Sequence, residues 1–117
     1  MTTLYGIPNC DTVKRARAWL DEHGVAYRFH DFKKEGVPEA RLDQWLLAPG
    51  WEALVNRRGT TWRRLDDAAR AAVVDAPSAR AAQLAHPSLI KRPVVEWESS
   101  AGVTTGFDAD QWKSHVV

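Results

Sequence analysis

The sequence predicts an α/β fold in which a four-stranded mixed sheet is covered by helices, with a helical insertion between a βαβ half and a ββα half. Three observations predict this class. Residues 2–30 have the pattern strand, helix, strand; the middle third carries helical patterns only; and residues 94–115 have the pattern of two strands and a helix. Strands joined through a helix run parallel, whereas the strands of a hairpin run antiparallel, so the predicted sheet is mixed.

The first half begins with a short apolar strand over residues 2–7, which ends at Pro8. Thr12 is expected to cap the helix that follows, and Gly24 stands where that helix ends. Residues 25–30 then alternate between apolar and polar side chains, which is typical of a strand. The predicted buried face of the helix carries Val13, Ala16, Trp19 and Leu20.

The middle third is predicted to be a helical insertion at about residues 38–87. Proline favours the first turn of a helix, and Pro-Gly pairs end helices, so these residues mark its boundaries. The first expected helix runs from Pro38 to Pro49-Gly50 and is followed by one further turn over residues 51–55. A second helix is expected from Asp66 or Asp67 to about Val74, and a third from Ser78 to His86.

The last part of the chain returns to a strand pattern. Residues 94–97 and 103–107 are predicted to form a hairpin joined by a glycine-containing turn. Asp108, with Gln111 three residues later, resembles a capping box for a last helix that ends near His115.

Composition limits the class of protein. The chain has 117 residues, of which 44% are apolar and 26% charged, so residues 1–117 are expected to form one domain whose core is anchored by six tryptophans. The net charge of +1 argues against broad electrostatic binding to nucleic acid. No apolar run is long enough to span a membrane, and the N-terminus has no signal-peptide pattern, so we expect a cytoplasmic protein with no membrane partner.

The chain contains a single cysteine, Cys10, which excludes an intramolecular disulfide, a CxxC redox pair and a multi-cysteine zinc site. The four histidines show no metal-ligand spacing, so neither a metal nor a prosthetic group is expected. Cys10 lies between the first strand and the first helix, where open α/β sheets bind ligands. The helix N-terminus stabilises a thiolate, Lys14 adds to this effect and Asp11 opposes it. An inert buried thiol remains the alternative.

Arginine supplies 11 of the 16 basic residues, and the segment 56–65 holds four arginines and no acid. Guanidinium groups bind carboxylates and oxyanions well. Arg63 and Arg64 are most simply interpreted as part of a solvated basic face. Arg92 differs because a residue before proline, here Pro93, is conformationally restricted.

Three segments, TLYGIPNCDTVKRARAWL (residues 3–20), RGTTWRRL (58–65) and IKRPVV (90–95), resemble the ArsC/Spx family, in particular its YffB-type branch of small ArsC-related proteins. The likeness runs in register over essentially the whole chain. The resemblance implies a thioredoxin-like fold with a helical insertion, which agrees with the order of elements predicted above.

The resemblance also implies roles for individual residues. Cys10 matches the family's reactive cysteine, and Arg92 matches the arginine before the family's cis-proline, here Pro93. Arg58, with Arg57 beside it, falls near the family's middle arginine. The predicted site therefore has Cys10 as the catalytic residue and, as residues that bind glutathione or substrate, Asn9, Thr12, Lys14, Arg57, Arg58, Arg92 and Pro93.

The chain departs from the family's patterns in two places. Arsenate reductases of this family carry a third arginine where this chain has Thr104 to Phe107, which weakens an arsenate assignment. Spx-type regulators usually carry CxxC, whereas the fourth position here is Val13, which removes the internal disulfide switch.

The function expected from these observations is a glutathione-dependent thiol reductase with Cys10 as its single nucleophile and glutathione as cosubstrate. Reduction of an oxyanion such as arsenate is a variant of the same chemistry. The alternative from another class is an Spx-like regulator that binds the RNA polymerase α subunit without thiol chemistry, and a chain that keeps the fold without activity is the third. Direct binding to nucleic acid is not expected.

Overall fold

The computed structural model describes residues 1–116 and divides into two compact units. The first unit contains residues 1–36 and the described residues from Arg92 onward, and the second unit is Val37–Lys91. The sequence predicts a helical insertion at about residues 38–87, and this assignment stays a prediction. That the whole chain is one domain stays a prediction.

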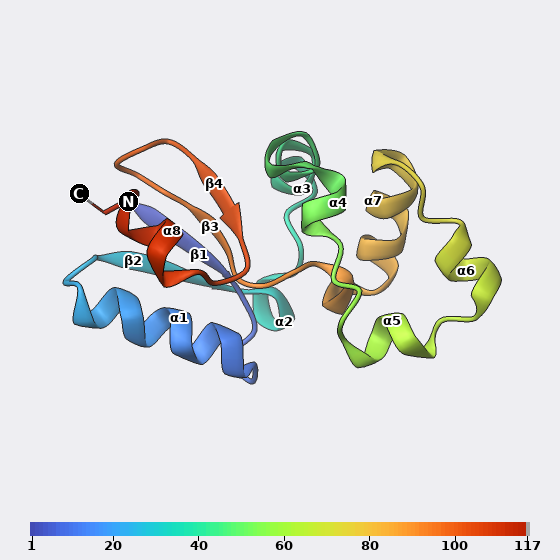
Figure 1. Cartoon of the computed structure of the whole chain (residues 1–117), viewed down its shortest axis with the longest axis horizontal. Helices are drawn as coiled ribbons and strands as arrows, with labels where there is room; N and C mark the ends of the chain where they lie inside the picture. The colour runs from blue at the N-terminus through green and yellow to red at the C-terminus, as the bar shows by residue number, and fades with distance from the viewer. Residues whose placement is uncertain (117) are drawn as a thin grey trace. The chain divides into compact units, whose positions relative to one another are not determined.

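The first unit contains a four-stranded sheet in the order β2-β1-β3-β4 (Figure 1). β1 pairs with β2 in parallel and with β3 antiparallel, and β3 pairs with β4 antiparallel. The predicted thioredoxin-like α/β class with a mixed sheet is therefore confirmed. The strands are β1 (Thr2–Gly6), β2 (Tyr27–Asp31), β3 (Val94–Glu96) and β4 (Val103–Thr105).

Helices α1 (Asp11–Glu22) and α8 (Ala109–Lys113) pack on one face of this sheet. Trp112 of α8 is fully buried, and its ring meets the rings of Trp19 and Trp97 edge-on at centroid distances of 5.6 and 4.9 Å. The face of α1 predicted from sequence is the one that is buried. The core residues here are Leu4, Val13, Ala16, Trp19, Leu20, Val95, Trp97 and Trp112.

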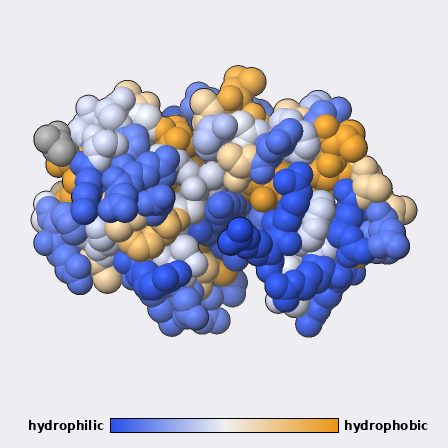
Figure 2. Space-filling view, in the orientation of Figure 1, coloured by the Kyte–Doolittle hydropathy of each residue, from blue (hydrophilic) through white to orange (hydrophobic). Residues whose placement is uncertain are grey.

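The second unit consists of short helices and turns. Val55 and Ile90 form an antiparallel bridge between the segments that follow α4 and precede Lys91. The surface over α5, at the lower right of Figure 2, is hydrophilic. The helices are α3 (Glu39–Trp45), α4 (Trp51–Leu54), α5 (Thr60–Arg64), α6 (Asp67–Ala71) and α7 (Ala76–Ala85).

Some local predictions were wrong. Thr12 does not cap α1, because the helix begins at Asp11, two residues earlier than a cap at Thr12 requires, and Cys10 is its N-cap. Two short helices, α5 and α2 (Phe32–Glu35), were not predicted, and α6 ends before Val74. Within residues 1–116, no helix has the length and apolar character needed to cross a bilayer.

Candidate functional site

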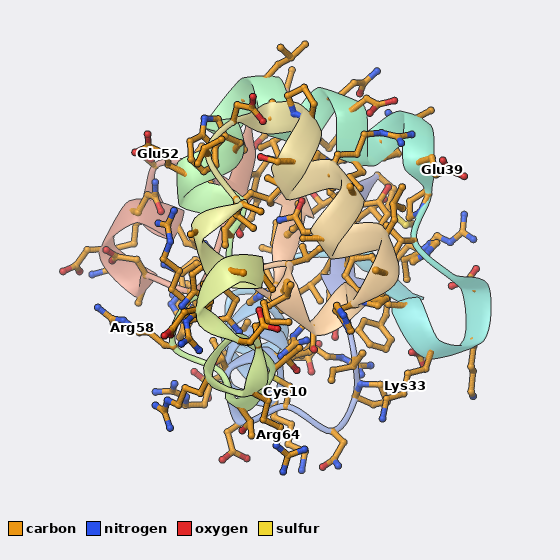
Figure 3. The ribbon with its side chains drawn as sticks, turned by 90° about the vertical axis from the view of Figure 1, so that its right-hand side faces the viewer. Cys10, Lys33, Glu39, Glu52, Arg58 and Arg64 are labelled. Atoms are coloured by element: carbon orange, nitrogen blue, oxygen red, sulfur yellow. The ribbon has the colours of Figure 1, made fainter. Side chains whose placement is uncertain are left out.

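Cys10 lies in the loop between β1 and α1, at the N-cap position of the helix (labelled in Figure 3). Its carbonyl oxygen accepts a hydrogen bond from the backbone N–H of Lys14 at 2.9 Å, which closes the first turn. The side chain is half-buried and packs against the core cluster under α1. It makes no capping hydrogen bond, so the first amides of α1 are not satisfied by the thiol. The thiol is neither fully exposed nor enclosed.

Strand register places Arg92 and Pro93 at the same edge of the sheet as Cys10. Tyr5 near the end of β1 pairs with Val94 at the start of β3, and the two strands run antiparallel. The residues that follow β1 and the residues that precede β3 therefore leave the sheet at one edge. The Arg92–Pro93 peptide bond is cis, as the family resemblance implied.

Arg92 is half-buried, and its Nε is buried without a hydrogen-bond partner among residues 1–116. No other interaction of its guanidinium occurs within the described chain. A buried donor left unpaired costs about 1–3 kcal/mol, and more when it is charged. A bound carboxylate or thiolate would remove this cost, so Arg92 is suited to hold an anion at the sheet edge that carries Cys10.

The other predicted residues of the first unit differ in what they can contribute. Asn9 and Lys14 are exposed on either side of Cys10, and Thr12 is half-buried in the first turn of α1. Pro93 is buried, has no N–H, and its carbonyl oxygen already accepts from the backbone N–H of Gly106 at 2.9 Å. Pro93 is thus placed to shape the edge and has no free N–H to offer a peptide ligand.

The segment that follows β4 lies at this edge as well, because Val94 pairs with Thr105. Residues 104–107 contain no cation, and the backbone of Gly106 is bonded to Pro93. The position where arsenate reductases of the family carry a third arginine therefore supplies no positive charge here.

Arg57 and Arg58 belong to the second unit, and their surroundings distinguish them. The Arg57 guanidinium lies 5.9 Å from the ring centroid of Trp51 and 5.7 Å from that of Trp62. Arg58 is exposed, its backbone N–H donates to Asn56 Oδ1 at 3.2 Å, and no partner of its guanidinium occurs among residues 1–116. Arg58, which the resemblance places near the family's middle arginine, is the better placed of the two to bind an anion.

Sequence reasoning missed several residues around Arg58. Trp51 and Trp62, expected in the core, are only half-buried and hold Arg57 instead. A pocket of about 280 Å³ lies beside the two arginines and is also lined by Glu52 and Lys91. Lys91 lies more than 30 positions after the arginines in the sequence. A pattern of neighbouring residues therefore could not predict that Lys91 and the arginines line one pocket. Within residues 1–116 no group of histidine, cysteine, aspartate and glutamate side chains could hold a metal ion.

Comparisons with known proteins connect these features to a family. The family model described as ArsC family matches residues 5–115. The solved structure of the YFFB (PA3664) protein is 44% identical, with full coverage of both chains and a TM-score of 0.90. An arsenate reductase (ArsC) related protein from Brucella melitensis is 48% identical over 97% of this chain and 92% of that chain, with a TM-score of 0.75. The global transcriptional regulator Spx of Listeria innocua is 28% identical over 95% of this chain and 83% of its own length.

Proposed function

Because this chain belongs to the ArsC family, we propose that it is a glutathione-dependent thiol reductase in which Cys10 is the nucleophile. The observation that carries the proposal is the half-buried thiol at the start of α1 on the sheet edge that also bears the unpartnered guanidinium of Arg92. Cys10 is half-buried, and Arg92, a cation, precedes the strand that pairs with β1.

The reaction proceeds through two exchanges at sulfur. The Cys10 thiolate attacks the glutathionyl sulfur of a mixed disulfide; the substrate sulfur leaves as a thiolate, and a Cys10–glutathione disulfide forms. A second glutathione thiolate then attacks that glutathionyl sulfur, which releases Cys10 and yields oxidised glutathione. The resolving thiol comes from outside because the chain has no second cysteine. The electrons come from glutathione.

The remaining residues of the sheet edge bind and orient glutathione. Arg92 holds a glutathione carboxylate or the leaving thiolate, since its fork of donors suits both. We assign binding of the tripeptide to Asn9, Thr12 and Lys14, which lie within four residues of Cys10 in the chain, and shaping of the surface to Pro93. We place the protein in the cytoplasm, where a lone thiol of this kind remains reduced.

The test is the formation of a glutathione adduct on Cys10 after exposure to oxidised glutathione, followed by mass spectrometry. We expect a single adduct in the native protein, none in Cys10→Ser, and a rate about tenfold lower in Arg92→Ala, because one charge-assisted contact is lost. Arg15→Ala is the matched control, since Arg15 is exposed on α1 and has no partner among residues 1–116. Glutathione-dependent turnover that survives in Cys10→Ser contradicts the proposal.

Arsenate is the second candidate substrate, supported by the likeness to an arsenate reductase related protein. Attack of Cys10 on an oxyanion held by arginines is the same chemistry at the same edge. The missing cation at residues 104–107 makes us expect slower turnover with arsenate than with a glutathione mixed disulfide. Turnover of both compounds by the same preparation decides between them.

A regulator of transcription is the candidate from another class, supported by the likeness to Spx. The surface that contacts the polymerase would contain the exposed arginines Arg63 and Arg64 of α5. A basic face of this kind attracts an acidic surface on the partner. Capture of the RNA polymerase α subunit by Cys10→Ala at low salt supports this function. No capture contradicts it.

A further inference from the structure

The second unit contains a pocket of mixed charge. Its volume is about 280 Å³, and it forms because the bridge between Val55 and Ile90 brings the segment after α4 next to Lys91. Two backbone hydrogen bonds of 2.8 Å, from Asn56 N–H to the Leu89 carbonyl and from the Lys91 N–H to that of Leu54, fix this arrangement. The pocket thus has rigid backbone walls and charged side chains at its rim.

The cations of the pocket are Arg57, Arg58 and Lys91. Arg57 is held over two indole rings, as described above, which leaves the charge of its guanidinium in place but restricts its movement. Arg58 has no internal partner within residues 1–116, and its backbone is fixed by Asn56. Arg58 is therefore the side chain most able to close on an anionic group.

Glu52 is the single acid that lines the pocket, and Figure 3 shows it on the same side of the second unit as Arg58. It differs from the other acids of the second unit in its lack of a partner. Among residues 37–91 it is the one acidic side chain with no cap, hydrogen bond or ion pair. The other acids bind Arg80 or Arg70 or cap a helix: Glu39, Asp43, Asp66, Asp67 and Asp75.

A pocket with cations and one unpaired carboxylate suits a ligand that carries both charges. A simple oxyanion would gain from the arginines but would be repelled by Glu52, whereas an α-amino acid head group presents a carboxylate and an ammonium on one carbon. We propose that this pocket binds an α-amino acid head group, with Arg58 on the carboxylate and Glu52 on the ammonium. Resting on the proposed function, we take S-methylglutathione, whose γ-glutamyl end is such a head group, as the probe of this pocket.

The test uses S-methylglutathione, which keeps the head group and has no reactive thiol, so binding is measured without chemistry. By calorimetry, we expect Glu52→Gln to weaken its binding about two- to fivefold, the range for one exposed ion pair, and Arg58→Gln to weaken it about tenfold, because a bidentate contact is stronger. The analogue that lacks the amino group should bind Glu52→Gln as tightly as the native protein or more tightly, because the substitution removes a carboxylate that repels it.

Two matched controls separate the pocket from general charge effects. Glu22→Gln and Arg64→Gln make the same changes at exposed positions that have no partner among residues 1–116, and both should bind S-methylglutathione as the native protein does. Equal binding of S-methylglutathione to the native protein and to Glu52→Gln overturns the inference, and so does weaker binding of the analogue without the amino group to Glu52→Gln than to the native protein.

The two proposals fail separately. If Cys10→Ser retains glutathione-dependent turnover while Glu52→Gln weakens S-methylglutathione binding, the reductase mechanism is wrong and the pocket stands. If turnover depends on Cys10 while Glu52→Gln has no effect on binding, the reductase stands and the assignment of the pocket is wrong.

Discussion

The most direct prediction concerns Gly6, the last residue of β1, where the strand passes under α1. A Cβ built on Gly6 would lie 2.9 Å from Cγ2 of Val13. Val13 is fully buried and β-branched, so its side chain has few rotamers and is closely packed. Gly6→Ala must therefore shift the first turn of α1 or the end of β1.

The expected loss of stability follows from two opposing effects. Overpacking of a buried site costs about 1–3 kcal/mol. Replacement of glycine by alanine stabilises by about 0.4–1 kcal/mol through the unfolded chain. The first effect is larger, so Gly6→Ala should lower the free energy of unfolding by roughly 1–2 kcal/mol, with a fall in Tm of about 4 °C per kcal/mol.

Urea unfolding of a double-mutant cycle with Val13→Ala measures this directly. Val13→Ala removes both γ-methyl groups, so adding Gly6→Ala to that variant should cost nothing or stabilise it. The coupling energy between the two substitutions should be about 1–2 kcal/mol, within the usual range for residues in contact. Additive effects of the two substitutions would refute the reasoning.

Three further predictions concern the second unit. Arg70→Ala should lower the free energy of unfolding by about 1–3 kcal/mol in urea, because its guanidinium holds carbonyls at the end of α5; an unchanged midpoint contradicts this. Hydrogen bonds from Ser78 lower the pKa of Asp75, so the charged carboxylate stabilises the folded protein. In thermal melts, the Tm of the native protein should exceed that of Asp75→Asn at pH 7, and this difference in Tm should disappear as pH falls below 3.8. A difference in Tm that does not change with pH contradicts this. Arg57→Gln should change tryptophan fluorescence and Arg58→Gln should not.

Local patterns in the sequence were sufficient to predict the sheet and α1. The strands at residues 2–7 and 25–30 follow apolar runs or strict alternation, and the buried face of α1 follows the 3.6-residue period. The hairpin after Pro93 also follows from its turn residues. These elements are determined by side chains within a few positions of one another, which is the information a single sequence carries.

Helix α5 could not be predicted in this way because its start has no capping side chain and its end is held by a side chain outside the helix. It begins after Gly59, which offers no side chain for capping, with two β-branched threonines. Its last carbonyls accept from the guanidinium of Arg70, beyond the end of the helix. The N-cap of α1 was also predicted wrongly. Thr12 has the better capping side chain, but the backbone enters the helix directly after Cys10, so Cys10 occupies the N-cap position.

The arrangement of the arginines is the part of the candidate site that the sequence left least defined. Most of them are held inside their own unit, by an aromatic ring, a carbonyl or a carboxylate. Among residues 1–116, the arginines without a side-chain hydrogen bond, ion pair or ring contact are Arg15, Arg58, Arg64 and Arg92.

Burial separates these four arginines. Arg15 and Arg64 are exposed, so water satisfies their donors at little cost and no ligand is required. Arg58 is exposed but lies at a pocket with an unpaired carboxylate. Arg92 alone has a buried Nε, whose desolvation is not compensated by any group of the described chain. An anion that reaches the sheet edge of Cys10 therefore gains most from Arg92. For this reason Arg92→Ala, and not a change at an exposed arginine, should slow the reaction of Cys10 with glutathione. A thiol that reacts only because it is accessible would react equally fast in Arg92→Ala.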